Sequence, residues 1–110
     1  MAHDPTDLRA EAEREAEGVE EKRVRELQEA ADVRWLMRQV PFRRFMLRWL
    51  EKLGVWEDFF SESTAATNRF LGIRSVGLEI LLELGMHAPE AVDQMLSERR
   101  VREGMKSNGR

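Results

Sequence analysis

Cysteine and tyrosine are absent from this sequence of 110 residues, and histidine occurs only twice. Without cysteine, disulfide bonds and thiolate metal sites are excluded. His3 and His87 are far apart in sequence, which disfavours a metal site built on both histidines. No run of about 18 apolar residues occurs, so no membrane-spanning helix is predicted. The first residues have no apolar segment of the signal-peptide type, and the length predicts a single domain.

These absences leave few side chains suited to catalysis. Glu79 and Glu83 are four residues apart on a predicted helix, where two carboxylates can in principle hold a cation. Such a pair is more often a solvated strip or a partner for arginine. We predict that the protein is not an enzyme, and we expect no catalytic residue, no cofactor, no metal site and no small-molecule substrate.

Charge is weak overall but unevenly placed. The net charge is −3, which argues against a dedicated nucleic-acid binder. The balance is −5 over residues 1–30, +4 over 31–56, −3 over 57–89 and +1 over 90–110. The chain therefore joins an acidic arm to a basic segment.

The acidic arm, residues 6–31, is rich in the strong helix formers alanine, glutamate, arginine and leucine. Thr6 or Asp7 is suited to cap its start. Its apolar residues are too sparse to bury against a core. Two interpretations remain open: a solvated, partly frayed helix or disordered arm, and a helix that becomes ordered on an oligomeric partner.

The pattern changes at Asp32, which we expect to cap a short helix ending near Gln39. Pro41 then predicts a break, because proline favours the first turn of a new helix. In the helix that follows, apolar residues have the spacing of one continuous stripe: Phe42, Phe45, Met46, Trp49, Leu50 and Leu53. Gly54 is expected to end this helix.

After an aromatic loop at residues 55–63, Ser61 or Ser63 is expected to cap a helix that Gly85 stops. This helix is apolar nearly all round, so it is either the buried central element or has one face covered by another subunit. Gly72 and Gly77 would allow close approach of a neighbouring helix. Pro89 is expected to open the last helix.

Together these patterns predict an all-α protein. We expect a compact three-helix core, built from about 33–53 with a break at Pro41, 62–84 and 89–103, plus a long acidic N-terminal helical arm. The expected domains are an arm at 1–31, a core domain at 32–103 and a loose tail at 104–110. The predicted core side chains are Phe42, Phe45, Trp49, Leu50, Phe70, Ile73, Ile80 and Leu81. If Phe45 and Trp49 are buried, truncating either to alanine should cost ~3–5 kcal/mol.

The stretch RWLMRQVPFRRFMLRWLEKLGVW, residues 34–56, mixes arginine with aromatics. Such a mixture suits a nucleic-acid groove, a membrane-surface helix, a calmodulin-type target or the inward and outward faces of ordinary core helices. Spacing puts most of the aromatics on the core side and the arginines on the solvent side, which disfavours nucleic acid and membrane. A protein partner is favoured by the excess apolar surface of the helix at 62–84, by the sparse apolar stripe of the acidic arm and by the basic strip, which is complementary to acidic segments. The predicted partner-contact residues are a basic face and two aromatics off the core stripe: Arg34, Arg38, Arg43, Arg44 and Arg48, with Trp35 and Trp56.

Four motifs follow one another between residues 32 and 97: DVRWLMRQVPFRRFMLRWLEKLGVW, FFSES, TAATNRFLGIRSVGLEILLEL and APEAVDQML. In this order they resemble a family of small tailed-phage proteins, encoded among the virion structural genes near the portal and capsid genes and first catalogued in a Bordetella podophage. The first motif matches the family pattern at Asp32, Arg34, Leu36, Pro41, Arg43 or Arg44, Phe45, Leu50, Glu51, Gly54 and Val55. The later motifs match it at Phe60, Ser63, Asn68, Gly72, Arg74, Val76, Gly77, Leu78, Leu81, Leu82, Glu83, Pro89, Glu90, Ala91, Met95 and Leu96.

The chain departs from the family pattern at two places. Ser61 and Glu62 stand where the family has glycine and asparagine before the serine, and Val92 replaces an aromatic. A contact made by that glycine–asparagine turn would be missing here.

The resemblance implies a virion structural or assembly protein that acts through protein–protein contacts at the portal or head–tail vertex, in multiple copies. Its implied partners are the portal or other virion proteins and further copies of itself, and its implied location is the virion, with the host cytoplasm during assembly. One alternative is an internal-core or ejection protein that is released with the genome and contacts DNA or the host membrane. A second is a scaffold-like or DNA-packaging accessory factor.

Overall fold

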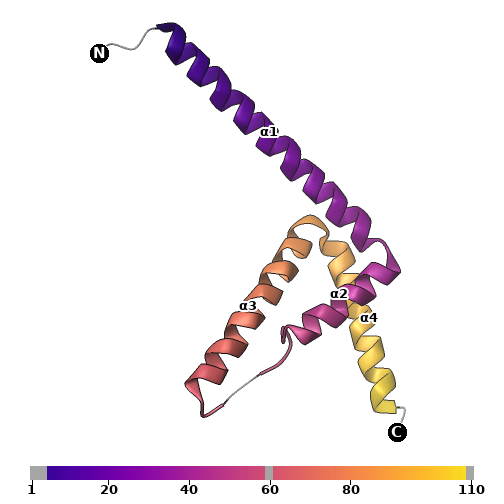
Figure 1. The fold of residues 1–110 in the computed structure, drawn as a ribbon. Coiled ribbons are helices and arrows are strands. Elements are labelled where there is room, and N and C mark those ends of the chain that lie inside the picture. The colour runs from indigo at the N-terminus through magenta and orange to yellow at the C-terminus, as the bar shows by residue number, and fades with distance from the viewer. Residues whose placement is uncertain (1–4, 59–60, 109–110) are drawn as a thin grey trace. The chain divides into compact units, whose positions relative to one another are not determined.

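The computed structural model describes residues 5–58 and 61–108, and every regular element among them is a helix. The helices are α1 (Pro5–Met37), α2 (Val40–Lys52), α3 (Thr64–His87) and α4 (Pro89–Asn108) (Figure 1). The all-α prediction is therefore confirmed. The chain divides into two units, Met1–Asp32 and Val33–Arg110, which are described separately.

Helix α1 runs without interruption from Pro5 to Met37, so the predicted helix start at Asp32 is wrong. The residues before Asp32 are two alanines, which favour helix and offer no reason to break it. The Asp32 carboxylate accepts a hydrogen bond of 2.9 Å from Gln28 Nε2 one turn earlier, within the same helix, instead of capping a new one.

The turn between α1 and α2 lies at Arg38 and Gln39, just before Pro41. In a continuous helix the residue-41 N–H would donate to the carbonyl of Met37, but proline has no N–H and its ring clashes with that carbonyl. The Arg43 side chain fills the vacant position, since its Nη1 donates to the Met37 carbonyl oxygen at 2.9 Å. Arg43 thereby satisfies a carbonyl that would otherwise be left open at the end of α1.

Gly54 ends α2 as predicted. Its φ of +74° is one that side-chain-bearing residues rarely adopt. The Gly54 N–H donates to the Glu51 carbonyl and the Val55 N–H to the Leu50 carbonyl, which is the Schellman arrangement. A Cβ at position 54 would lie 2.7 Å from the Phe70 ring, so both the conformation and the space require glycine.

Helix α3 begins where the sequence indicates, since the Ser63 Oγ accepts a hydrogen bond from the Ala66 N–H. Its predicted end near residue 84 is wrong, because Gly85 is inside the helix, which continues to His87. Pro89 opens α4 as expected. The predicted loose tail from residue 104 is also wrong, because α4 continues to Asn108. Phe59 and Phe60 of the aromatic loop lie outside the described residues.

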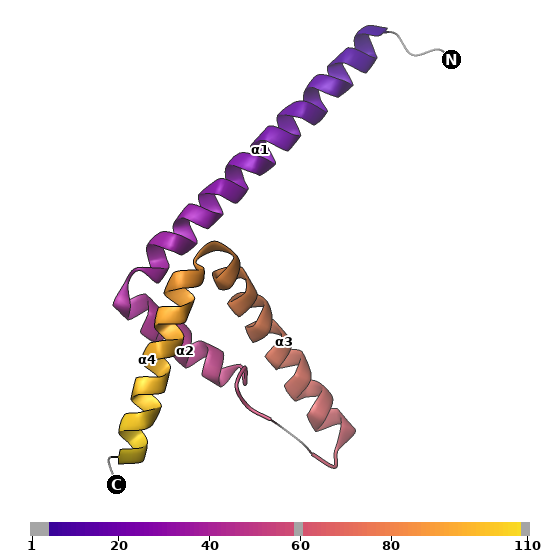
Figure 2. The same ribbon diagram turned by 180° about the vertical axis from the view of Figure 1, so that it is seen from behind.

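Within the unit Val33–Arg110, helices α2, α3 and α4 contact one another (Figure 2). The last turn of α1, the end of α2 and the facing sides of α3 and α4 enclose one apolar cluster. Its buried members are Met37, Met46, Leu47, Leu50, Val55, Leu84, Ala88, Val92 and Met95. Phe42, Ile80 and Leu81 are partly buried against this cluster, and Phe70 is also partly buried.

The structure corrects the predicted core at three positions: Phe45, Trp49 and Ile73 are each 44% exposed. On α2 the buried side instead contains Arg43, Met46, Leu47 and Leu50. The helix is thus turned relative to the predicted stripe, so that its largest rings lie at the edge of the core. In this orientation the Arg43 side chain is buried and forms hydrogen bonds to Glu98 and to the Met37 carbonyl.

The two glycines predicted to permit close approach differ. A Cβ at Gly77 would lie 2.6 Å from Val55 Cγ2 and 3.0 Å from Leu53 Cβ, so Gly77 is where α3 meets the end of α2. A Cβ at Gly72 would meet nothing within 4 Å. Only Gly77 serves the predicted purpose.

Candidate partner-binding surface

The structure does not bring the five arginines of the predicted basic face together on one surface. Arg34 and Arg38 belong to the α1 end of the unit, where they line a hollow with His87 at the end of α3 and Glu90 at the start of α4. Arg44 and Arg48 are exposed on α2. Arg43 is only 8% exposed, and its assignment to a partner-contact face is therefore corrected.

Arg43 joins α2 to α4. Its Nε and Nη2 lie 2.9 and 2.8 Å from the same Glu98 oxygen, while its Nη1 is bonded to α1. The hydrogen bond from Arg43 is the main cause that lowers the pKa of Glu98, with a further hydrogen bond from Gln94, against the opposing effect of partial burial. Pro41 is a sequence signal for the bond from Arg43 to α1, because it leaves the Met37 carbonyl open, but it does not indicate Glu98.

A groove lies between α2 and α4, with a volume of about 480 Å³. Its apolar lining includes Val40 and Leu47 of α2 and two exposed residues of α4, Val101 and Met105. The basic residues that line it are Arg44, Arg48 and Arg102. Sequence reasoning missed this groove because the α4 residues that form it fall near and beyond the predicted end of that helix.

Helix α2 has a row of three aromatic rings, of which two are exposed and the third, Phe42, is partly buried against the core. The Phe42 and Phe45 centroids are 6.2 Å apart, and those of Phe45 and Trp49 are 6.4 Å apart. Arg48 lies over Phe45 at 5.8 Å, and Lys52 lies over Trp49 at 4.9 Å. The expectation that aromatics and cations are on opposite sides of this helix is therefore wrong at these exposed residues.

The two predicted partner-contact tryptophans differ in accessibility. Trp35 is 59% exposed near the end of α1. Trp56 is partly buried against the core, and the Arg99 guanidinium lies 4.4 Å above its ring. The Glu51 carboxylate pairs with Arg99 and Arg102 next to it. Trp56 is thus already covered by this chain's own α4.

Helix α3 is not the buried central element that its apolar sequence allowed. Only Gly77 and Leu84 are buried along its length. Four large apolar side chains of α3 are exposed and lie on one face of the helix, because they are seven, four and four residues apart. They are Leu71, Leu78, Leu82 and Met86. No described part of the unit Val33–Arg110 covers this face, which we call the α3 apolar face.

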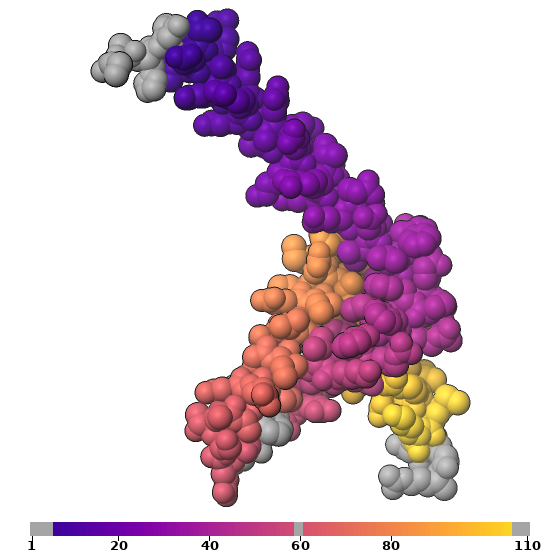
Figure 3. Space-filling view, in the orientation of Figure 1, coloured from indigo at the N-terminus to yellow at the C-terminus, as the bar shows by residue number. Residues whose placement is uncertain are grey.

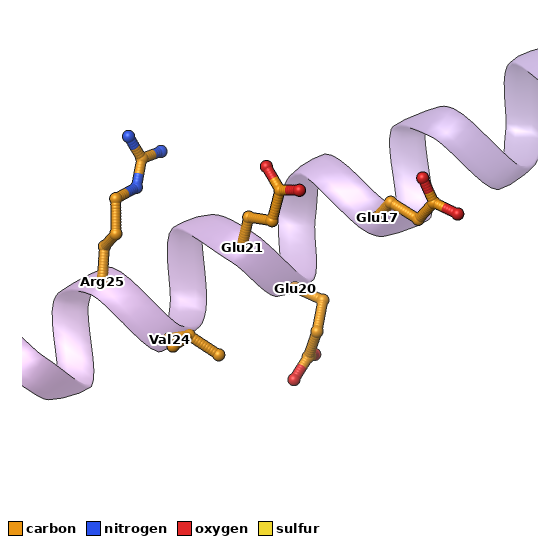
Figure 4. A pocket seen from close by; sticks show the side chains of 5 residues that line it. All are labelled: Glu17, Glu20, Glu21, Val24 and Arg25. Atoms are coloured by element: carbon orange, nitrogen blue, oxygen red, sulfur yellow. The ribbon is translucent and has the colours of Figure 1, made fainter.

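In the unit Met1–Asp32, α1 is a single helix with its side chains projecting from all sides (Figure 3). A hollow outlined there by Glu17, Glu20, Glu21, Val24 and Arg25 has walls from one helix only, and these side chains point in several directions around it (Figure 4). Because a single helix forms its walls, it is an open depression on the surface of α1.

Among residues 5–58 and 61–108, no group of three or more histidines and carboxylates is placed to hold a metal ion. No helix in that part of the chain is long and apolar enough to cross a membrane. Comparisons of the chain with protein-family models, curated proteins and solved structures found no match.

Proposed function

We propose that the protein is a non-enzymatic structural or assembly protein of a tailed-phage virion, acting by protein–protein contacts at the portal or head–tail vertex in multiple copies. In this proposal the unit Val33–Arg110 is a helical core domain and the acidic part of α1 is an arm for assembly. The protein would reside in the virion and, during assembly, in the host cytoplasm.

The observation that carries the proposal is the α3 apolar face. Leu82 and Met86 are 65% and 68% exposed, and Leu71 and Leu78 extend the same face along the helix. Chains that act alone rarely expose contiguous apolar surface of this kind, and such patches mark sites where proteins associate. The spacing of these residues on one helix suits packing against a partner helix.

The phage assignment rests on the motif resemblance between residues 32 and 97. Two motif residues have structural roles that are consistent with it: Gly54 forms the turn after α2, and Gly77 allows α3 to approach that turn. These roles explain why glycine is needed at both positions. The phage assignment and the virion location both depend on the resemblance itself.

A second candidate function is an internal protein that is ejected with the genome and contacts DNA. It is favoured by the two exposed rings of α2, Phe45 and Trp49, because Arg48 and Lys52 lie beside them on one surface. Aromatic rings next to cations can stack bases and bind phosphates.

Mass spectrometry of purified virions tests the location, and comparison of particles before and after DNA release separates the two candidates. Retention in emptied particles supports the structural role, and loss with the DNA supports ejection. Absence from clean virions would contradict both and favour a scaffold-like factor.

The α3 apolar face is tested by measuring complex formation with the portal protein by size-exclusion chromatography with light scattering. The double variant Leu78→Ser and Leu82→Ser should weaken the complex, because both side chains leave water on binding. The control is Arg69→Gln with Glu83→Gln, two exposed positions of the same helix that lie at least 100° around its axis from the centre of the face, and it should leave binding unchanged. Equal effects of the two variants would contradict the proposed face.

A further inference from the structure

We propose that the groove between α2 and α4 binds the acidic helix of a second copy of this chain, through the α1 segment at residues 8–20. The inference rests on the assembly role proposed above and names the surface through which copies join. It uses a different surface from the α3 apolar face, which is left for the other virion protein.

The groove has the chemistry of a site for an amphipathic acidic helix. Val101 and Met105 are 62% and 69% exposed, and Val40 adds apolar surface from α2. Arg44 and Arg48 line the groove and form no ion pair among the described residues. Of the other charged residues that line it, Glu98 is held by Arg43 and Arg102 by Glu51. The charge still free to bind a partner is therefore positive.

The segment at residues 8–20 has the matching pattern. Its apolar residues lie at i, i+4, i+8 and i+11, which places them on one side of the helix: Leu8, Ala12, Ala16 and Val19. At 100° of rotation per residue, glutamates flank this stripe on both sides. Glu11 and Glu15 lie on one side of it, and Glu13 and Glu20 lie on the other. None of these four acids forms an ion pair within the described part of the chain.

The apolar positions of the segment are open to a partner. Leu8 and Val19 are 52% and 70% exposed. A helix docking in the groove would cover these side chains together with Val101 and Met105, and it would place carboxylates beside Arg44 and Arg48. Apolar burial would supply affinity and the charges would set orientation.

Along the continuous helix α1, the segment is well separated from the groove of its own chain. Residue 20 lies 17 residues before Met37, which is ~25 Å along a helix that rises ~1.5 Å per residue. Helix α2 has 13 residues and is therefore only ~20 Å long by the same rise. Even if α1 lay alongside α2, residues 8–20 would extend past its far end. A second copy has no such restriction.

This mode of association is head-to-tail, because each copy offers a segment at one place and a groove at another. Head-to-tail contacts close into a ring when the rotation between copies permits, and otherwise extend as a filament. The chain thus carries both halves of an interface that can generate a multi-copy assembly.

The test uses the full chain and two charge-reversed variants, followed by light scattering and sedimentation. The groove variant is Arg44→Glu with Arg48→Glu, and the arm variant is Glu11→Arg with Glu15→Arg. The native chain should self-associate at low salt and less at high salt. Each variant alone should self-associate at least about tenfold more weakly than the native chain, because charge reversal replaces attraction with repulsion.

Mixing the two variants gives the sharpest result. The groove variant keeps an intact arm and the arm variant an intact groove, and the reversed arm also complements the reversed groove, so the mixture should recover the association that each variant alone has lost. The matched control is Glu79→Arg with Glu83→Arg, which reverses two exposed acids at the same spacing on α3 and should leave self-association unchanged.

Native tryptophan fluorescence of each variant establishes that the core is folded. If the groove variant unfolds, the milder Arg44→Gln with Arg48→Gln takes its place in both experiments. A native chain that stays monomeric at high micromolar concentration and low salt would overturn the inference, as would a mixture that associates no more strongly than each variant alone. Salt-sensitive binding of labelled single-stranded DNA by a monomeric native chain, lost in the groove variant, would assign this surface to nucleic acid instead. Virion mass spectrometry is independent of all these outcomes.

Discussion

Replacing Arg43 with methionine tests the account of how α1, α2 and α4 are joined. Arg43 makes contacts of 2.8 and 2.9 Å to Glu98 and donates a third bond of 2.9 Å to the Met37 carbonyl. A hydrogen bond to a charged group contributes ~1.5–3 kcal/mol net, and a neutral one ~0.5–1.5 kcal/mol. The Glu98 side chain keeps 27% of its surface in solvent and can be partly rehydrated, so the total is discounted. We expect Arg43→Met to lower the free energy of unfolding by ~2–4 kcal/mol.

Urea unfolding followed by tryptophan fluorescence measures this loss. All three tryptophans, Trp35, Trp49 and Trp56, lie in the unit Val33–Arg110, so the signal does not include the acidic arm. With an m-value of ~1 kcal/mol/M for a unit of this size, the midpoint should fall by ~2–4 M. Arg48→Met on the exposed side of the same helix is the control and should cost less than ~0.5 kcal/mol. Equal losses in the two variants would refute the role assigned to Arg43.

The same pair predicts how the loss depends on pH. The pKa of Glu98 in the folded protein is below its ordinary value of 4.5, because Arg43 stabilises the carboxylate. The stabilisation is therefore fully present above pH 4.5 and is lost as the pH falls through the lowered pKa. The difference between the native chain and Arg43→Met should shrink in acid, and the part due to the Met37 carbonyl should remain. A difference that grows in acid would contradict this assignment.

Two further comparisons test the core. Gly77→Ala should lower the free energy of unfolding of the unit by ~1–3 kcal/mol, because its Cβ would meet Val55 at 2.6 Å. Gly72→Ala should raise it by ~0.5–1 kcal/mol, because nothing lies within 4 Å and alanine favours helix. The melting temperatures of the two variants should therefore shift in opposite directions, and shifts of the same sign would contradict the packing. Leu50→Ala should lower the free energy of unfolding by ~3–5 kcal/mol, because Leu50 is fully buried. Trp49→Ala should lower it clearly less, because the Trp49 side chain is 44% exposed. Equal losses in urea unfolding would mean that Trp49 is a core residue after all.

Local signals in the sequence were sufficient for several features of the fold. Ser63 marks the start of α3, and Gly54 marks the end of α2, because each residue meets a backbone requirement that few others meet. Pro89 likewise indicates the start of α4. Gly85, in contrast, was a misleading signal, because α3 does not end there. Glycine only lowers helix propensity, and here the helix continues through it to the turn at Ala88.

The orientation of α2 could not be read from its pattern. The predicted stripe containing Phe45 and Trp49 and the observed one containing Met46, Leu47 and Leu50 both have helical spacing. A binary pattern counts Arg43 as polar, yet arginine can be buried when its donors are satisfied, and here they bond to Glu98 and Met37, one of which lies 55 residues away. On α3, apolar residues occur on most sides, so periodicity could not identify which side is buried.

The placement of the methionines has a practical consequence for mapping both proposed surfaces. Met37, Met46 and Met95 are buried, whereas Met86 on the α3 apolar face and Met105 in the groove are more than two-thirds exposed. Mild peroxide converts accessible methionine to the sulfoxide and spares the buried side chains. Each surface therefore contains one native sulfur whose oxidation rate should fall when that surface is covered. Peptide mass spectrometry of the unmodified chain can then report which of the two surfaces a given partner occupies.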